Sequence, residues 1–190
     1  MRTLKVLCCL STPALALTLA AAAALSPNPS QATVSDVAAN GFTLQIETHI
    51  AASPDKVYAA LIEPARWWSS DHTFSGDSKN LHLEAKAGGC WCEILANGGS
   101  VTHLMVVYAD PGKALRLRGA LGPFQGLGVA GALTWKLKPA AEGTDLSAVY
   151  AVGGYNKDGF AQLSQAGDSV LTTQVGRLKQ LIESSAVRTR

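Results

Sequence analysis

Apolar and polar residues alternate along the first clearly patterned segment of the chain, residues 42–50. A period of two residues is typical of a strand with one buried face, so we expect a strand here. Ser53, Pro54 and Asp55 then supply an N-cap oxygen, a residue suited to the first helical position and a negative charge for the positive end of a helix. A short helix should therefore follow and end before Pro64, as the first of two short helices after the strand.

The middle of the chain alternates in the same way and is divided by glycine-containing turns. Gly88-Gly89 and Asn97-Gly98-Gly99 have the residue types that tight hairpins require, and short hairpins make neighbouring strands antiparallel. The pattern predicts six further strands, at residues 81–86, 90–95, 100–109, 114–119, 131–138 and 145–152.

From Phe160 the apolar residues recur at spacings of three and four, which is typical of an amphipathic helix. The apolar stripe of this long C-terminal helix needs a partner, and the apolar face of the sheet is the only predicted surface large enough. The sequence therefore predicts the fold class α+β, with an antiparallel sheet of about seven strands packed on the long helix.

The first residues have the layout of a secretory signal peptide. Arg2 and Lys5 precede an uncharged apolar run, residues 6–25, and a polar segment with two prolines follows. Small residues favour cleavage after Ala32, with a second choice near Ala24, and the predicted location is secreted, in the periplasm. A retained transmembrane anchor is the alternative, because the apolar run is about long enough to cross a bilayer.

Cleavage would leave one domain and remove the excess of positive charge. Residues 1–32 contain two of the 16 basic residues and no acid, so 14 basic residues remain against 14 acidic ones. A neutral domain has no field that attracts nucleic acid or an anionic membrane, and no stable membrane span should remain. The boundaries that we expect are a signal peptide at 1–32, a flexible leader at 33–40, one domain at 41–184 and a tail at 185–190.

The segment from Ser53 to Leu61, with Trp67-Trp68 after it, resembles the opening motif of the START, polyketide-cyclase and birch-pollen-allergen superfamily (SRPBCC). The resemblance implies the helix-grip fold, in which a curved antiparallel sheet wraps around a long C-terminal helix. Members include lipid carriers, hormone receptors, cyclases and chaperone cofactors, so the resemblance selects no single activity. Three segments look like the branch related to activators of the heat-shock ATPase chaperone, at residues 72–76, 88–93 and 121–123.

A cavity between the sheet and the C-terminal helix is the expected site, and a small hydrophobic or amphipathic ligand is the expected partner. Aromatic residues with one hydrogen-bonding tip suit such a lining, although core packing is the alternative for each of them. The glycine-rich stretch 119–131 is either a flap over the cavity mouth or a plain loop. The residues that we expect to line the cavity are Trp67, Trp68, Leu121, Phe124, Trp135, Tyr150 and Tyr155.

A cyclase- or hydratase-type enzyme is the second hypothesis, with His72, His103 or Glu93 as the cavity acid or base. For His72, which lies in a predicted loop beside the tryptophans, plain solvent exposure is the alternative. For His103 the alternative is a core histidine bonded to a backbone group. Glu93 is either a solvated carboxylate or faces a partly apolar cavity, which would raise its pKa. The third hypothesis is a module that holds another exported protein in an exposed groove.

Cys90 and Cys92 are the two cysteines that would remain after cleavage, and they share one face of a predicted strand. Three states stay open: two reduced buried thiols, a disulfide between them, or part of a metal or redox site. A metal site needs two more ligands, and nothing in the spacing of the histidines brings one to this pair. We therefore expect no metal.

The motifs of several enzyme classes are missing from the sequence. It has no nucleophile elbow, no H-E-x-x-H helix and no P-loop lysine motif. Residues 126–131 match the dinucleotide pattern G-x-G-x-x-G, but an alternating strand follows them where that site needs a helix. These observations lower the expectation of hydrolase, metalloprotease or nucleotide chemistry, and no cofactor is expected.

Overall fold

The structure of the chain is a computed structural model that describes residues 31–187, with side chains from residue 34 to residue 185. Nearly all of the predicted signal peptide lies outside the described residues, so export and cleavage stay predictions. Within residues 31–187, no helix combines the length and the apolar character that crossing a membrane requires.

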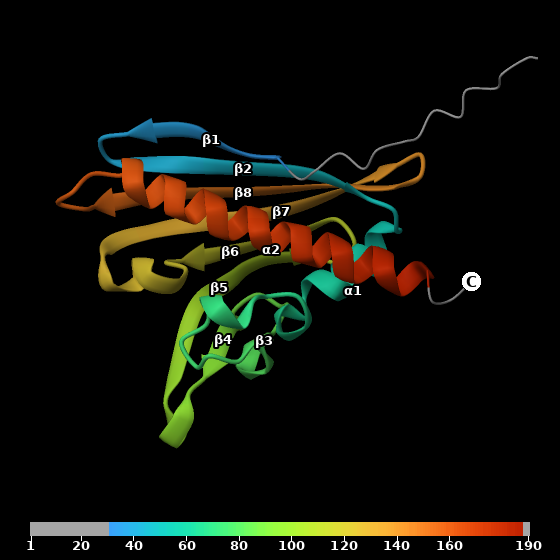
Figure 1. Cartoon of the computed structure of the whole chain (residues 1–190), viewed down its shortest axis with the longest axis horizontal. Coiled ribbons are helices and arrows are strands. Elements are labelled where there is room, and N and C mark those ends of the chain that lie inside the picture. The colour runs from blue at the N-terminus through green and yellow to red at the C-terminus, as the bar shows by residue number, and fades with distance from the viewer. Residues whose placement is uncertain (1–30, 188–190) are drawn as a thin grey trace, which may run out of the picture.

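Eight antiparallel strands form one sheet, in the order β1-β2-β8-β7-β6-β5-β4-β3. Strands that follow one another in the chain are neighbours, except β2 and β3: β2 pairs with β8, and β3 forms the far edge of the sheet (Figure 1). The strands are β1 (Gln31–Ala38), β2 (Gly41–Ile50), β3 (Leu81–Leu83), β4 (Cys90–Ile94), β5 (Ser100–Asp110), β6 (Ala114–Gly119), β7 (Gly128–Ala140) and β8 (Gly143–Tyr155).

Two α-helices accompany the sheet, α1 (Pro54–Leu61) and α2 (Ala161–Val187). The long helix α2 lies across one face and contacts β1, β2 and α1. Strands β3, β4 and β5 bend away from it, as Figure 1 shows, and the segment after α1 lies beside them. The predicted α+β fold, a curved antiparallel sheet with a long C-terminal helix, is confirmed. Three short 3-10 helices occupy the segment after α1, at Pro64–Arg66, Ser70–His72 and Ser78–Asn80.

The sheet has eight strands rather than about seven, because part of the predicted flexible leader 33–40 belongs to β1. Antiparallel pairing places Val34 opposite Leu44 in β2, and Val34 is partly buried against the core. This apolar contact and the backbone pairing together give the segment a fixed place in the sheet. Helix α2 likewise continues to Val187, into the predicted tail. Cleavage after Ala32 would remove the first two residues of β1.

A cluster of four tryptophans joins the segment after α1 to the sheet. Trp67 meets the rings of Trp68, Trp91 and Trp135 edge to face, with centroid distances of 5.6, 6.0 and 6.3 Å. This geometry is favourable for aromatic rings and adds to the free energy gained by burying them. The Trp67 indole N–H also donates to the carbonyl oxygen of Ala60 in α1, at 3.1 Å. The cluster thus holds the end of α1 against the sheet.

Replacement of Trp67 by alanine should lower the free energy of unfolding by about 3–5 kcal/mol, since it removes a fully buried ring and leaves a cavity. Chemical denaturation monitored by circular dichroism measures this loss. Tyr155→Ala is the control, because Tyr155 is 74% exposed and its loss should change stability by less than about 0.5 kcal/mol. Equal losses in the two variants would contradict the central place of the cluster.

Candidate functional site

A cavity of about 320 Å³ lies between α2 and the curved half of the sheet. Loop residues 71–74 and the segment 121–124 form two of its walls, and the sheet contributes Leu81, Trp91, His103 and Tyr150. The helix side is made of small and apolar residues, which leave space beside the sheet: Leu163, Ala166, Gly167, Val170 and Leu171. The cavity arises because α2 packs on β1 and β2 while β3 to β5 curve away from it.

The segment between β6 and β7 covers one part of the cavity and is tied to Tyr150. The Tyr150 hydroxyl accepts from the Leu121 N–H at 3.1 Å and donates to the Gly119 carbonyl oxygen at 3.4 Å. Burial raises the pKa of Tyr150 to about 12, so this hydroxyl keeps its proton at neutral pH. At Gly131 a Cβ atom would lie 2.7 Å from the Tyr150 ring, so glycine is needed for the close approach of β7.

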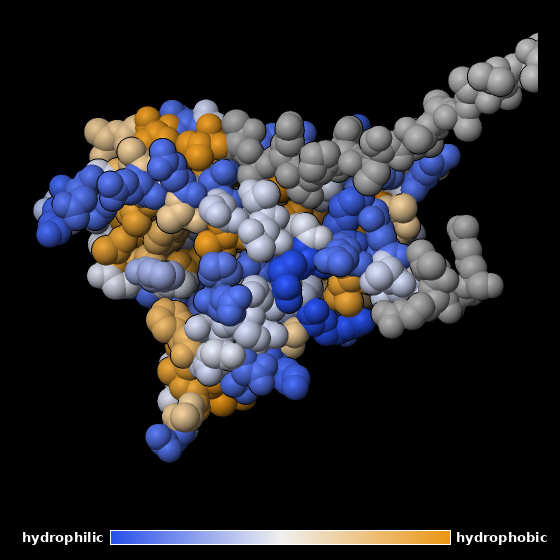
Figure 2. Space-filling view, viewed as in Figure 1, coloured by the Kyte–Doolittle hydropathy of each residue, from blue (hydrophilic) through white to orange (hydrophobic). Residues whose placement is uncertain are grey.

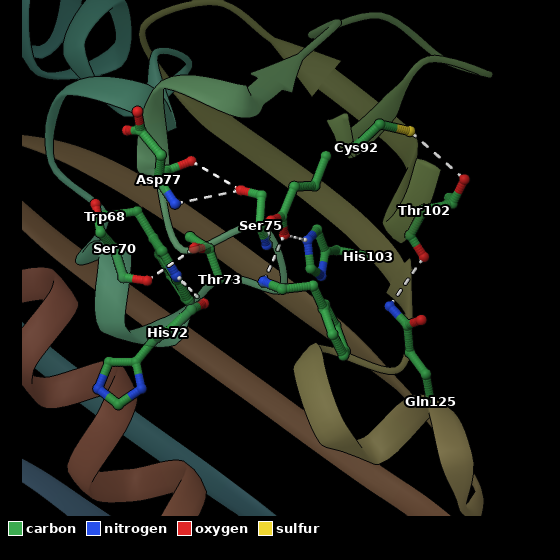
Figure 3. A network of polar contacts seen from close by, with 12 residues as sticks. Trp68, Ser70, His72, Thr73, Ser75, Asp77, Cys92, Thr102, His103 and Gln125 are labelled. Carbon is green, nitrogen blue, oxygen red and sulfur yellow. Dashed lines mark hydrogen bonds and ion pairs between the residues drawn. The ribbon is translucent and has the colours of Figure 1, made fainter. Parts of the chain in front are cut away.

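A buried carboxylate and an imidazole form a pair at the wall of the cavity. Glu93 on β4 is 0% exposed, and its Oε2 lies 3.0 Å from Nε2 of His103 on β5. The backbone N–H of Phe74 donates to Oε2 at 3.1 Å, and the N–H of Ser75 donates to Oε1. Figure 3 shows two partners in this network, His103 and Ser75, close to each other. The Glu93 carboxylate thus joins the strands β4 and β5 to the loop.

A β-bulge gives His103 its place beside Glu93. Trp91 pairs with Leu104 and Cys92 pairs with Thr102, so His103 is the extra residue between these two pairs. Bulges change the direction of side chains, and here two successive residues, His103 and Leu104, are both buried.

The surroundings of the pair determine which partner carries charge. Burial raises the pKa of the Glu93 carboxyl, but hydrogen bonds from Ser75, Phe74 and His103 outweigh burial and lower the pKa overall. Burial lowers the pKa of the His103 imidazole, and the neighbouring Glu93 carboxylate offsets only part of that effect. Near neutral pH the pair is therefore a carboxylate and a neutral imidazole.

This charge state fixes the tautomer of His103. A carboxylate can only accept hydrogen bonds, so the Nε2 of His103 carries the proton and donates it to Glu93. The other ring nitrogen, Nδ1, then bears a lone pair. The structure thus differs from two sequence-based alternatives: His103 bonds a carboxylate rather than a backbone group, and Glu93 is buried with a lowered pKa rather than a raised one.

Two buried nitrogen atoms of cavity residues have no hydrogen-bond partner within the described part of the chain, Nδ1 of His103 and Nε1 of Trp91. The Phe74 ring stacks on the imidazole with centroids 5.9 Å apart, yet Phe74 is 54% exposed. Buried polar atoms without partners cost free energy, and neither nitrogen has exposed surface toward the cavity as it stands.

His72 occupies the rim of the cavity rather than its interior. Its side chain is exposed, and its backbone carbonyl oxygen accepts from the Trp68 indole N–H at 2.8 Å. Asp71 and Thr73 lie beside it in the cavity lining. The rim is therefore polar, whereas the interior is apolar apart from His103 and the polar tips of Trp91 and Tyr150.

The cavity includes four of the seven predicted lining residues, Trp68, Leu121, Phe124 and Tyr150. The structure places the other three elsewhere. Trp67 and Trp135 are 1% exposed and pack in the tryptophan cluster, and Tyr155 ends β8, where the sheet meets solvent. For Trp135, alternation gave only the face of a strand, not the distance along it to the cavity.

Several lining residues carry no chemical signal that marks a site in the sequence. The five residues from α2 belong to the apolar stripe by which the long helix was predicted, and the stripe alone does not separate core from cavity. Trp91 shares a strand face with Glu93, a pattern visible in the sequence, but its role depends on the loop that folds over both.

The structure joins Cys90 and Cys92 in a disulfide, with Cα atoms 5.4 Å apart, on the sheet face away from Trp91 and Glu93. The sequence left three states of the two cysteines open, and the structure has the second of them, a disulfide between the pair. One expectation needs correction: His82 on β3 pairs with Cys92 on β4, so strand pairing brings a histidine to the cysteines that spacing did not.

Comparisons with known proteins give a family match over most of the described chain. A family model described as polyketide cyclase / dehydrase and lipid transport matches residues 41–183. Among curated proteins, none matches the sequence.

Solved structures share the fold at low sequence identity. Protein MLL2253 from Mesorhizobium loti is 18% identical with a TM-score of 0.56, and the match covers 75% of this chain and 97% of that one. An uncharacterised protein from Rhizobium leguminosarum is 17% identical with a TM-score of 0.57, covering 83% and 99%. CalU16 from Micromonospora echinospora is 15% identical with a TM-score of 0.54, covering 84% and 88%. These likenesses show the fold alone.

Replacement of Glu93 by glutamine should destabilise the protein by about 1–3 kcal/mol, because the amide presents N–H groups where the carboxylate accepts hydrogen bonds from the loop. Urea denaturation gives the change in free energy of unfolding. Glu84→Gln is the matched control, since Glu84 is exposed and only pairs with Lys86. Wild-type stability in Glu93→Gln would show that the carboxylate does not hold the loop.

Proposed function

Because the chain belongs to the polyketide cyclase/dehydrase and lipid-transport family, as the match over residues 41–183 shows, we propose that it binds a small apolar or amphipathic molecule. The proposed site is the cavity between α2 and the curved half of the sheet. The observation that carries the proposal is the cavity itself, about 320 Å³ of space with a mostly apolar lining in the middle of the fold.

The size and lining of the cavity suit a small organic ligand. Ligand pockets typically measure about 300–1,000 Å³ and combine an apolar lining with a few polar groups, and this cavity lies at the lower end of that range. The exposed polar side chains of Asp71 and His72 lie at its rim. A ligand with an apolar body and at least one polar group therefore fits better than a plain hydrocarbon.

The polar rim supports an amphipathic ligand and gives it a direction. Asp71, His72 and Thr73 all lie at the rim and can hydrogen-bond a polar head. The apolar body would then lie against Leu163 and Val170 of α2. Together with the predicted signal peptide, this favours an exported domain that holds a poorly soluble molecule in an aqueous compartment, which we include in the proposal.

The Glu93–His103 pair favours a second candidate function, proton transfer of the cyclase or dehydratase type. A neutral imidazole with its Nε2–H held by a carboxylate can act as a base through Nδ1, and the carboxylate stabilises the imidazolium that forms. A carbon next to a carbonyl is a suitable proton donor: the C–H bond breaks, an N–H bond forms at Nδ1, and the electron pair moves onto the carbonyl oxygen.

Nδ1 has no exposed surface, so its contact with a ligand requires a neighbouring side chain to move. Phe74 stacks on the imidazole, is half exposed and belongs to the loop rather than to the sheet. In this candidate function we propose that Phe74 is the side chain that moves.

Replacement of Val170 by tryptophan should fill the cavity and weaken ligand binding by at least about tenfold, because the indole would occupy the volume of the ligand. The measurement is a fluorescence titration with an anilinonaphthalene sulfonate probe, together with extraction and mass spectrometry of molecules that copurify with the wild-type protein.

Ser169→Trp is the matched control, since residue 169 is exposed on the same helix and lies outside the cavity lining. It should bind the probe as the wild type does. Wild-type probe binding by Val170→Trp, or a cavity with neither copurified nor titratable ligand, would contradict the proposal.

Replacement of His103 by glutamine should slow proton exchange at the acidic carbon of a bound β-diketone by about 100-fold or more, because general bases contribute about 10²–10⁴-fold to such steps. Exchange in D₂O is followed by NMR, and binding of the same diketone is measured separately. His49→Gln is the control, because His49 is an exposed residue bonded to Asp145. If the wild-type protein exchanges this proton no faster than buffer does, proton transfer is contradicted and ligand binding remains the proposed function.

A further inference from the structure

A cluster of soft metal-ligating side chains lies on the sheet face opposite the cavity. The side-chain donor atoms of His82, Cys90 and Cys92 all lie within 4.8 Å of one another. They come from β3 and β4, at the end of the sheet where β3 forms an edge strand. His82 is exposed, so the cluster is open to solvent on one side.

Strand geometry explains why these residues meet. Cys90 and Cys92 are two residues apart on β4 and therefore share one face, while Trp91 and Glu93 point to the buried side. His82 is directly opposite Cys92 in the antiparallel pair β3–β4, and residues opposite each other project to the same face.

A fourth soft donor lies across the other neighbour of β4. Met105 on β5 is directly opposite Cys90, and it is 40% exposed although methionine is an apolar residue. Directly opposite residues have Cβ atoms about 4.5–5.5 Å apart, which places the flexible thioether within reach of the Cys90 sulfur. After reduction of the disulfide, two thiols, one imidazole and one thioether would lie on the same face of three adjacent strands.

We propose that this cluster binds a monovalent copper ion, Cu(I), when the two cysteines are reduced. Thiolate and thioether sulfurs are ligands that select soft metals such as Cu(I), and imidazole also suits copper. Cys90 and Cys92 would be the two thiolate ligands, with His82 as the nitrogen ligand and Met105 as the weak fourth ligand. The hydroxyl of Thr102, 3.5 Å from the Cys92 sulfur, can orient that ligand (Figure 3).

The disulfide makes metal binding depend on redox state. A dithiol reductant, such as the active-site pair of an exported thiol oxidoreductase, would transfer two electrons and two protons: the S–S bond breaks, two thiols form, and the reductant becomes a disulfide. Cu(I) then replaces the two thiol protons as its bonds to sulfur form. In the oxidised form seen here the sulfurs bond each other, and the site is closed to the metal.

This site is independent of the proposed ligand cavity. The cluster and the cavity lie on opposite faces of β4, so copper binding could fail while ligand binding holds, and the reverse. Variants at His82 and Met105 change exposed side chains that do not line the cavity.

The test is a titration with Cu(I), without oxygen, against the chromogenic chelator bicinchoninate. The purified full chain carries Cys8→Ser and Cys9→Ser throughout and serves as the wild type of the comparison, because those two thiols would also bind Cu(I). Protein reduced with a phosphine and desalted should withdraw one Cu(I) per chain from the chelator, and the oxidised protein should withdraw none. His82→Ala and Met105→Leu should each weaken Cu(I) binding by at least about tenfold. Loss of a residue that only hydrogen-bonds a metal ligand already costs about 10–100-fold in metal affinity, and these two residues would be ligands themselves.

Cys90→Ser and Cys92→Ser should each abolish competition with the chelator, and His49→Ala should bind as the wild type does. The oxidised and reduced wild-type proteins give the main comparison without any substitution in the cluster, so a variant that fails to fold leaves the test intact. Three results would overturn the proposal: no copper retained by the reduced protein, equal retention by the oxidised protein, or tighter binding of Zn²⁺ than of Cu(I) in the same titration.

Discussion

The buried carboxylate of Glu93 sets the constraint on which the site depends. An ionised group with no exposure to solvent must have its charge balanced by hydrogen bonds, and Glu93 obtains them from His103 and from two loop backbone N–H groups. That requirement fixes the bulge in β5 and the path of the loop over the strands at once. Hydrogen bonds to a buried charge therefore shape this wall of the cavity as much as the packing of apolar side chains does.

The uneven packing of α2 provides the space. A helix that covered the sheet evenly would exclude a cavity, but α2 contacts β1 and β2 while the β3 to β5 half curves away. The segment after α1 and the Gly122–Gly126 turn fill part of the gap, and the rest is the cavity. In the view of Figure 2, hydrophobic residues gather on the left side and at the lower left of the molecule, and the middle of this face is more polar.

The fold could be predicted from the sequence because it follows from local periodicity, whereas only part of the site could. Alternation along residues 42–50 and the helical period after Phe160 depend on neighbours in the chain, and both elements were found. The Glu93–His103 bond depends on a one-residue bulge that no period reveals. Trp135 lies in the tryptophan cluster instead of the cavity for a related reason, since alternation gives the face of a residue but not its distance from the cavity. The strand β1 was missed because six of its eight residues are small or polar, and among its described side chains only Val34 packs against the core.

The place of β8 in the sheet has a consequence for the order in which the chain can fold. β2, near the start, pairs along its whole length with β8, and α2 comes later still. Contacts between distant parts of a chain form slowly, because loop closure costs entropy before the pairing compensates for it. The N-terminal half therefore has no finished sheet to join until the last third of the chain is present. Much of the sheet therefore forms only when the chain is nearly complete, and a chain cut short before β8 would leave β2 without one of its two partner strands.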